Sequence, residues 1–197
     1  VPSMLSSFLE YLESVQEKYD LHSLNQVFCS GEALTKYHVK QFNKLIGSNY
    51  QTSLANLYGP TEATVDVSYF DCQEIEKFNS IPIGRPIDNI NLYIVDPYFN
   101  LLPVGVPGEL CISGDGLARG YLNRPELTAE KFVENHFNNG DKLYRTGDLA
   151  RWLPDGNIEF LGRIDHQVKI RGYRIELGEI ENQLLDYEGI EEAVVIA

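Results

Sequence analysis

The sequence predicts a mixed α/β fold whose pattern changes twice along the 197 residues. In residues 1–80, apolar residues at helical spacing alternate with short apolar runs, which is typical of parallel strands joined by helices. In residues 81–162, short β runs are broken by Gly, Pro, Asn and Asp, which indicates strands joined by tight turns. After Gly162 comes a polar, basic stretch, and the alternation of helix and strand then returns.

Each element of the first part has its own signal. The spacing of Met4, Leu5, Phe8, Leu9, Leu12 and Val15 predicts an amphipathic helix within 3–18. The apolar run 24–29 predicts a short buried strand, and Thr35 is expected to cap a helix that continues to about Ile46. Residues 52–57 predict a second strand, which runs directly into a Gly-Pro turn.

The later parts contain four clear elements. NLYIVD (91–96) and GELCIS (108–113) read as strands, and RWLPDGNIEF (151–160) reads as a hairpin because PDGN is a strong turn signal. A helix is expected from about Leu177 to Leu185, followed by a final strand in AVVIA (193–197). Because the sequence starts without Met and stops inside this apolar run, we expect it to be an excerpt of a longer polypeptide.

Composition excludes several classes of protein. The net charge of -13 argues against a general binder of nucleic acids or anionic membranes. No apolar run approaches the roughly 20 residues of a membrane span. Cys29, Cys72 and Cys111 are odd in number and scattered, which fits neither a disulfide framework nor a zinc site, so a cytoplasmic protein is expected. The four histidines show no metal-ligand spacing.

Two short segments place polar groups directly after predicted strands. SGEAL (30–34) offers small residues, where a backbone can approach a flat ligand, and YGPTE (58–62) follows the next strand. In an open α/β sheet, ligands sit beyond the carboxyl ends of strands. Tyr58 could stack on a base, Thr61 could bind a phosphate oxygen and Glu62 could hold Mg²⁺. The alternative is a surface turn and helix cap, with Tyr58 in the core and Glu62 in solvent.

The segment YRTGDLARW contains a further candidate, Asp148. This residue lies between Gly147 and Leu149 and is expected to be buried. An acidic side chain here could accept hydrogen bonds from two ribose hydroxyls. An Asx-turn or a helix cap is the alternative interpretation.

Taken together, four segments resemble one family. YGPTE, GELCISGDGLARGY, YRTGDLARW and GRIDHQVKIRGYRIELGEIE are similar, in order and spacing, to core motifs of adenylate-forming enzymes, and most of all to the amino-acid adenylation domains of non-ribosomal peptide synthetases. The resemblance implies the back part of the large lobe, with an α/β section in 1–80 and a distorted, β-barrel-like section in 81–162. It also implies a hinge at 163–165 and the start of a small α+β C-terminal lobe in 166–197.

The resemblance assigns roles to individual residues. The residues expected to bind ATP are Gly31, Glu32, Ala33, Asn56, Tyr58, Thr61, Asp148 and Arg163. Within this set Gly31–Ala33 would line the adenine pocket with Asn56 and Tyr58 beside the base. Thr61 would contact the α-phosphate, and Asp148 would bind the ribose with Arg163 nearby. Glu62 would hold Mg²⁺.

The end of the chain is expected to move during the reaction. Asp165 matches the hinge of the family, and Lys169, Arg171 and Gly172 match a loop that enters the site for thioester formation. Thr61, Glu62 and Lys169 are therefore the predicted catalytic residues. The family's phosphate loop and ammonium-binding Asp would lie upstream and its C-terminal catalytic Lys downstream, so this piece is expected to be inactive alone.

The substrate pocket implied by the resemblance is formed by Phe28, Ser30, Leu57, Val65 and Asp66. The three apolar residues would make fairly tight walls, and a buried Asp66 needs a donor. This pattern is similar to the family's pattern for serine, with glutamine, glutamate or a basic amino acid as the alternative. The expected partners are this amino acid, a carrier domain with its phosphopantetheine thiol, and condensation domains. Other readings of the chain are an acyl- or aryl-CoA ligase and a non-catalytic nucleotide-binding module.

Overall fold

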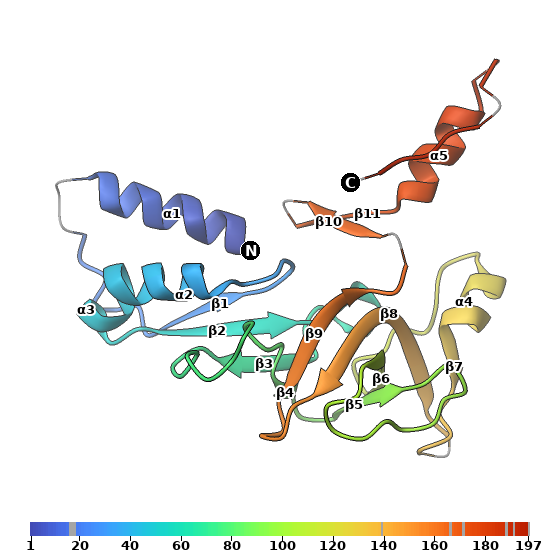
Figure 1. Ribbon diagram of the computed structural model, residues 1–197, viewed down its shortest axis with the longest axis horizontal. Helices are drawn as coiled ribbons and strands as arrows, with labels where there is room; N and C mark the ends of the chain where they lie inside the picture. Colours follow the sequence, from blue (N-terminus) through green and yellow to red (C-terminus); the bar gives the residue numbers. More distant parts are fainter. Residues whose placement is uncertain are drawn as a thin grey trace.

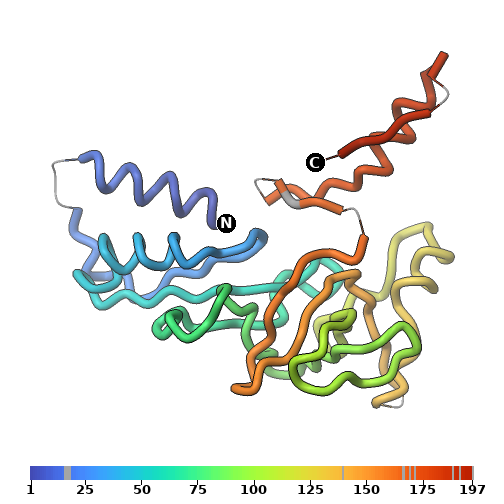
Figure 2. The backbone as a smooth tube through the Cα atoms, viewed as in Figure 1, coloured from blue at the N-terminus to red at the C-terminus, as the bar shows by residue number. Residues whose placement is uncertain are grey.

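The protein was analysed as a computed structural model that describes residues 1–15, 19–138, 140–165, 167–170, 172–187, 189–190 and 192–196. Figure 1 shows helices stacked on a sheet at the N-terminal side, a curled β-rich region beside it, and a small C-terminal part that projects away from both. The tube in Figure 2 follows the chain from the β-rich region into this C-terminal part through one connection. No helix in the described part of the chain is long and apolar enough to cross a membrane.

The first sheet has four strands in the order β1-β2-β3-β4. Their bounds are Gln26–Cys29 for β1, Ser53–Tyr58 for β2, Ser68–Asp71 for β3 and Arg85–Pro86 for β4. The expected parallel pairing holds for β1 and β2, whereas β3 and β4 are antiparallel to their neighbours. The sheet is therefore mixed, because the chain reverses after β2 at the Gly-Pro turn and returns directly as β3.

The helices on this sheet begin close to the predicted positions. Helix α1 spans Pro2–Ser14, and α2 spans Lys36–Phe42. Thr35 caps α2 as predicted, since its hydroxyl accepts from the His38 N–H while the His38 ring accepts from the Thr35 N–H. Beyond α2 the helical path continues as a π-helix, Asn43–Gly47, and then as α3, Ser48–Tyr50.

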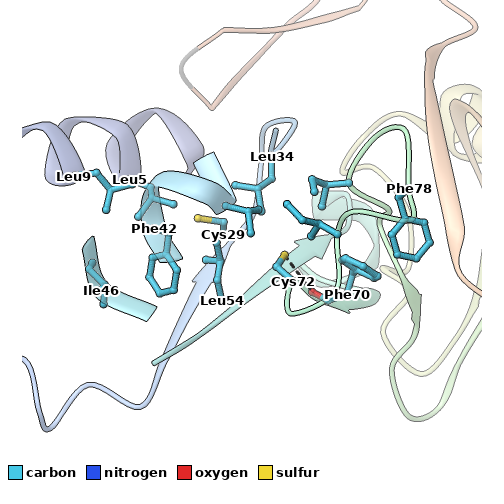
Figure 3. Packing of buried hydrophobic residues seen from close by; sticks show 13 residues of the cluster. Leu5, Leu9, Cys29, Leu34, Phe42, Ile46, Leu54, Phe70, Cys72 and Phe78 are labelled. Carbon is cyan, nitrogen blue, oxygen red and sulfur yellow. Dashed lines mark hydrogen bonds between the residues drawn. The ribbon is translucent and has the colours of Figure 1, made fainter. Parts of the chain in front are cut away.

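The core of this region lies between the helices and the sheet. Leu5 and Leu9 of α1 and Phe42 of α2 face Cys29 and Leu54 of the two parallel strands (Figure 3). Phe70 and Phe78 extend the same cluster, with ring centroids 5.2 Å apart in an edge-to-face arrangement. Cys29 and Cys72 are buried within this core. This packing holds the carboxyl ends of β1 and β2 in fixed positions.

The second sheet has five strands and curls into a half-barrel, which confirms the predicted barrel-like section. Its path is β5-β6-β8-β7, and β9 pairs with the other part of β8. Register shifts in the pairing of β8 with β6 and with β9 accompany the curl. The bounds are Ile90–Val95 for β5, Gly108–Gly114 for β6, Phe132–Glu134 for β7, Lys142–Trp152 for β8 and Ile158–Arg163 for β9, with helix α4 at Pro125–Lys131.

The C-terminal part consists of a hairpin and a helix. Strands β10, Val168–Ile170, and β11, Tyr173–Ile175, pair antiparallel, and α5 spans Leu177–Leu185 as predicted.

The predicted final strand is wrong for the described residues 192–196, which form no strand. The side chains of Val194 and Ile196 are 82% and 87% exposed, and the Val195 N–H donates to the Glu181 carboxylate instead of to a strand. In the described part of the chain these residues therefore run as exposed chain that pairs with no strand. Residue 197 lies outside the described residues.

Candidate active site

The two polar segments of the first sheet meet at one edge. Strand β1 ends at Cys29 and pairs there with Asn56 of β2, so the loop that starts at Ser30 lies beside the turn that follows Tyr58. This is the arrangement expected for parallel neighbours, whose carboxyl ends share an edge. Asp148 of strand β8, in the second sheet, lies at the same place: one cavity is lined by Asp148 together with Asn56 and Tyr58 of β2.

A cavity of about 330 Å³ opens between these elements. Seven residues that the sequence predicted for ATP binding line it together: Gly31, Glu32, Ala33, Asn56, Tyr58, Asp148 and Arg163. Leu57, predicted for the substrate pocket, also lines it. The Asn56 amide donates to the Pro82 carbonyl at 2.8 Å, which fixes the orientation of the Asn56 side chain at the cavity wall.

Further lining residues were not found from the sequence. They are Leu34, Gly59, Ser80, Ile81, Ile83, Phe160, Gly162 and Gln167. Leu34, Ile81, Ile83 and Phe160 have apolar side chains that form walls of the cavity. Apolar residues of this kind carry no reactive group, so a search for functional motifs does not single them out. Phe160 lies near Tyr58, with ring centroids 6.3 Å apart, and gives the cavity an aromatic side. The alternation of Ile81 and Ile83 around a proline was the available signal for a segment facing the cavity.

Asp148 is the centre of a buried polar network. Its side chain is 8% exposed; one oxygen accepts from the Arg163 guanidinium at 2.7 Å and the other accepts from the Tyr58 hydroxyl. Burial and the neighbouring Asp148 charge raise the pKa of Tyr58 well above its ordinary value, so Tyr58 stays a donor. Asp148 lies within strand β8 and is paired with Arg163 of β9, which excludes the alternative interpretation as a helix cap. Arg163 also donates to the Thr146 carbonyl at 2.9 Å.

A second cavity of about 250 Å³ adjoins the first and shares Tyr58, Asp148 and Arg163 with it. Thr61, predicted at the α-phosphate, lines this second cavity together with Tyr144 of β8. The wall opposite is formed by Gly172 and Arg174 of the C-terminal hairpin. The adjoining cavities thus offer an apolar and aromatic compartment connected to a polar one that contains two arginine side chains.

Glu62 is the middle residue of a short 3₁₀ helix, Thr61–Ala63, and is buried next to Thr61, which lines the second cavity. The Tyr121 hydroxyl donates to Glu62 Oε1 at 2.6 Å, and Arg174 Nη1 lies 2.8 and 2.9 Å from the two carboxylate oxygens. Burial by itself would raise the pKa of Glu62, but these donors together lower it below its ordinary value. Glu62 is therefore an ionised, buried carboxylate, not the solvent-exposed side chain of the alternative interpretation.

The residues predicted for the substrate pocket lie on both sides of the Gly-Pro turn. Ser30 donates to Asp66 at 2.6 Å, and Ser30 and Val65 line the second cavity. Phe28 and Val65 are 58% and 64% exposed in this chain, so their apolar surface is open here. Thr64 and Val65 both have positive φ angles, 58° and 74°, a strained conformation for β-branched residues.

The hinge and loop candidates lie between β9 and β11. Asp165 accepts from the Arg163 guanidinium and from the Gln167 N–H, and these bonds outweigh burial and lower its pKa. Lys169 lies in the middle of β10, but its side chain is outside the described residues, as is the whole of Arg171. Gly172 has a φ of +78°, which favours glycine at this turn. Arg174 of the hairpin, which the sequence analysis did not single out, lines the second cavity and contacts Glu62.

Comparison with known proteins agrees with this geometry. Residues 1–122 match the family model described as AMP-binding enzyme, which is more than half of the chain. The chain belongs to the AMP-binding enzyme family. This confirms the resemblance predicted from the motifs. A mycosubtilin synthase of Bacillus subtilis is 62% identical over 100% of this chain, which spans only 8% of that protein.

Solved structures show the same fold in this family. The Vibrio cholerae adenylation domain AlmE, determined with glycyl-adenosine-5'-phosphate, is 35% identical with a TM-score of 0.77, covering 91% of this chain and 33% of AlmE. PA1221, a non-ribosomal peptide synthetase protein with adenylation and PCP domains, is 32% identical with a TM-score of 0.78, covering 86% of this chain and 29% of PA1221. The half-barrel and the α/β region described above are thus the fold of an adenylation domain.

The residues present in this AMP-binding enzyme fit a magnesium ion that is shared with a nucleotide. Within the described part of the chain there is no cluster of three or more His, Cys, Asp or Glu side chains that could hold a metal by themselves. Mg²⁺ commonly binds through one or two carboxylates plus substrate phosphates. Glu62, which is ionised and lies next to Thr61, is a carboxylate ligand of this kind.

Proposed function

We propose that this chain is part of an enzyme that uses ATP to activate an amino acid as its aminoacyl-adenylate. The observation that supports this most is the joining of the two cavities by Asp148, Tyr58 and Arg163, with Thr61 at the polar end. An apolar, aromatic compartment suits a nucleobase, and a compartment that contains arginine guanidinium groups suits phosphates. The membership in the AMP-binding family and the similarity to adenylation domains agree with this reading.

In this proposal the adenine lies in the first cavity, against Gly31–Ala33 and beside Tyr58 and Asn56. The φ of +86° at Gly31 keeps this loop close to the ligand without a side chain in the way. Asp148 accepts from the ribose hydroxyls. Its carboxylate accepts from the Tyr58 hydroxyl and the Arg163 guanidinium, which orient it at the wall that the two cavities share.

The reaction in the proposal is in-line attack of the amino-acid carboxylate on the α-phosphate of ATP, with pyrophosphate as the leaving group. Thr61 donates to an α-phosphate oxygen and orients it for this attack, which is the positioning contribution to catalysis. Arg163 contributes positive charge close to the same oxygens. Glu62 would hold Mg²⁺, which when bound supplies charge neutralisation to the phosphates.

We propose serine as the amino acid. Ser30 and Asp66 form the polar end of the pocket, and Leu57 supplies an apolar side. A short hydroxyl can add a donor to the Asp66 carboxylate, whereas a large aliphatic side chain would leave a carboxylate against an apolar group at considerable cost. Phe28 and Val65 would form further apolar walls of the pocket. Asp66 could also serve a longer polar side chain.

The proposal has a second half-reaction, in which the aminoacyl group passes to the phosphopantetheine thiol of a carrier domain. Asp165 is the proposed hinge, and residues 166–197 would belong to a small lobe that carries Lys169 into the site. Condensation domains of the same synthetase would use the product. The adenylation and PCP domains that PA1221 combines in one protein support a carrier partner.

The test is ATP–pyrophosphate exchange by the complete adenylation domain, measured with each amino acid in turn. We expect a clear maximum with serine, because a site that hydrogen-bonds a hydroxyl discriminates strongly against the analogue without it. Exchange with alanine equal to that with serine, or a maximum with a long side chain, would overturn the serine assignment alone. Absence of exchange with every amino acid, in a folded domain that binds ATP, would overturn the activation of amino acids.

A further inference from the structure

The carboxylate of Glu62 is held by donors from two different parts of the fold. Tyr121 donates to Oε1 at 2.6 Å, and the Arg174 guanidinium contacts both oxygens, at 2.8 and 2.9 Å. The Glu62 side chain is 8% exposed and that of Arg174 is 36% exposed. The ion pair thus joins a half-buried arginine in the middle of β11 to a carboxylate that is almost fully shielded from water.

Tyr121 belongs to the same rigid region as Glu62. The Ala118 N–H donates to the Glu62 carbonyl at 2.8 Å, which ties the loop before Tyr121 to the 3₁₀ helix. The Tyr121 ring packs edge-to-face on Phe132, with centroids 5.7 Å apart, and its N–H donates to the Thr128 hydroxyl at 2.9 Å. Tyr121 is thus fixed relative to Glu62 by several independent contacts.

Arg174 comes instead from the hairpin that follows Asp165, and in Figure 1 this hairpin stands apart from the half-barrel at the end of a single connection. The contact between Arg174 and Glu62 joins residues 112 positions apart in sequence. A rotation at Asp165 would carry Arg174 away and leave Tyr121 in place. Of the two donors, only the charged one can leave with the C-terminal part.

When Arg174 moves away, the buried Glu62 carboxylate loses the positive charge that balances its own. A buried carboxylate with one neutral donor is strongly unfavourable unless a cation replaces the lost one. The same carboxylate is the proposed ligand for Mg²⁺, which binds oxygens at about 2.0–2.1 Å. Arg174 Nη1 lies 2.8 and 2.9 Å from the two Glu62 oxygens, so a metal ion bound to either oxygen would lie close to a group of the same charge. Arg174 and a metal ion therefore compete for the Glu62 carboxylate.

We propose that Arg174 is a positioning residue that takes the place of Mg²⁺ on Glu62 and thereby holds the C-terminal hairpin in the orientation seen here. Tyr121 keeps the carboxylate aligned for either occupant. This proposal rests on the function proposed above. Its consequence is reciprocal: bound metal disfavours this orientation, and this orientation disfavours bound metal.

The first measurement is Mn²⁺ binding to the complete adenylation domain saturated with a non-hydrolysable ATP analogue, followed by electron paramagnetic resonance. We expect Arg174→Gln to bind Mn²⁺ at least several-fold more tightly than the unaltered domain, and Glu62→Gln to bind it more weakly. Arg174→Lys keeps the charge and should fall between the two. The matched control is Arg85→Gln, which removes an exposed arginine that donates to the Asp155 carbonyl and should leave Mn²⁺ affinity unchanged.

The second measurement is the distance between labels on the two parts of the protein, at the exposed positions Tyr98→Cys and Tyr187→Cys. In the unaltered domain with the same ATP analogue, added Mg²⁺ should reduce the population with the distance seen here. In Arg174→Gln this population should already be small and respond little. A distance distribution that ignores Mg²⁺ in the unaltered domain, or equal Mn²⁺ affinity in the Arg174→Gln and unaltered domains, would overturn the proposal.

These outcomes are separate from those of the proposed function. Neither measurement uses an amino acid or turnover, so competition between Arg174 and metal can be observed even in a domain that binds the nucleotide but activates no amino acid. Conversely, serine-dependent pyrophosphate exchange with unchanged Mn²⁺ affinity in Arg174→Gln would retain the proposed function and remove only the role of Arg174.

Discussion

Ser30 donates a hydrogen bond of 2.6 Å to Asp66, across 36 positions of sequence. The bond joins the loop after β1 to the segment after the Gly-Pro turn, and so closes the polar end of the proposed substrate pocket. From the sequence alone, the substrate was expected to supply the hydrogen-bond donor that Asp66 needs. Ser30 supplies that donor, and the substrate hydroxyl becomes an additional one that the oriented carboxylate can accept.

The first prediction concerns this bond. Ser30→Ala should raise the KM for the amino acid, because Asp66 loses the donor that orients it. A loss of about 1–2 kcal/mol corresponds to roughly a five- to thirty-fold rise. The measurement is pyrophosphate exchange by the complete domain at varied amino acid, with ATP saturating. Ser53→Ala on β2 is the matched control. An unchanged KM in Ser30→Ala would mean that the bond has no part in recognising the substrate.

The second prediction concerns Asp148. Asp148→Ala removes the acceptor proposed for the ribose, and each lost charge-assisted hydrogen bond costs at most about 1.5–3 kcal/mol. The Kd for ATP, measured by calorimetry on the complete domain, should therefore rise at least ten-fold. Asp88→Ala, a change at an exposed carboxylate, should leave it unaltered. If ATP binds Asp148→Ala as tightly as the unaltered domain, Asp148 does not bind the ribose.

The third prediction separates the backbone of the hinge from its ion pair. Asp165 pairs with Arg163 through its side chain, so Asp165→Ala breaks the pair but leaves the backbone free to rotate. Asp165→Pro breaks the pair as well and fixes φ near about -65°. Amino-acid-dependent pyrophosphate exchange should survive in both variants, whereas loading of the carrier thiol should fall much further in Asp165→Pro. Equal loss of both reactions in the proline variant would argue against a hinge here.

The sequence predicted those parts of the fold that depend on local chemistry. Thr35 caps its helix, and the PDGN turn joins two strands, because a side-chain cap and a tight turn need only neighbouring residues. Asp148 was found because a carboxylate between apolar strand residues is unusual enough to be noticed. The final strand was wrong because pairing depends on a partner edge, which an apolar run does not reveal.

The missed parts of the site depend on distant residues. Arg174 is one of several cations in QVKIRGYR, and nothing local distinguishes it from the others. Its contact with Glu62 follows from how the hairpin is placed over the half-barrel. The reversal of β3 against β2 was missed for a similar reason, since the Gly-Pro turn is compatible with several directions of the following chain.

The last prediction concerns acid stability and a carboxylate outside the catalytic set. Glu159 of β9 is buried, accepts from the Ser80 hydroxyl at 2.6 Å and pairs with Arg151 at 2.7 Å. Burial by itself would raise its pKa, but the donation from Ser80 and the charge of Arg151 outweigh burial and lower the pKa from the ordinary value of 4.5. Ser80 lines the first cavity, so this network also supports the wall of the proposed nucleotide site.

Because the pKa of Glu159 is lower in the folded protein than in the unfolded chain, its ionised form stabilises the fold above the unfolded pKa. That contribution is lost as the pH falls through the folded value. Glu159→Gln should lower the free energy of unfolding by about 1–3 kcal/mol near neutral pH, since Arg151 loses its charged partner. The variant should then lose less stability than the unaltered domain on acidification to about pH 3.

The measurement is the thermal unfolding midpoint of the complete domain at a series of pH values, compared between Glu159→Gln and the unaltered protein. Other buried carboxylates titrate in both proteins, so the difference between the two curves isolates Glu159. The curves should converge as the pH falls. Glu126→Gln, at an exposed position of α4, serves as the control and should follow the unaltered protein throughout. Curves for Glu159→Gln that stay parallel to the unaltered protein from neutral to acid pH would show that Glu159 is not held ionised by Ser80 and Arg151.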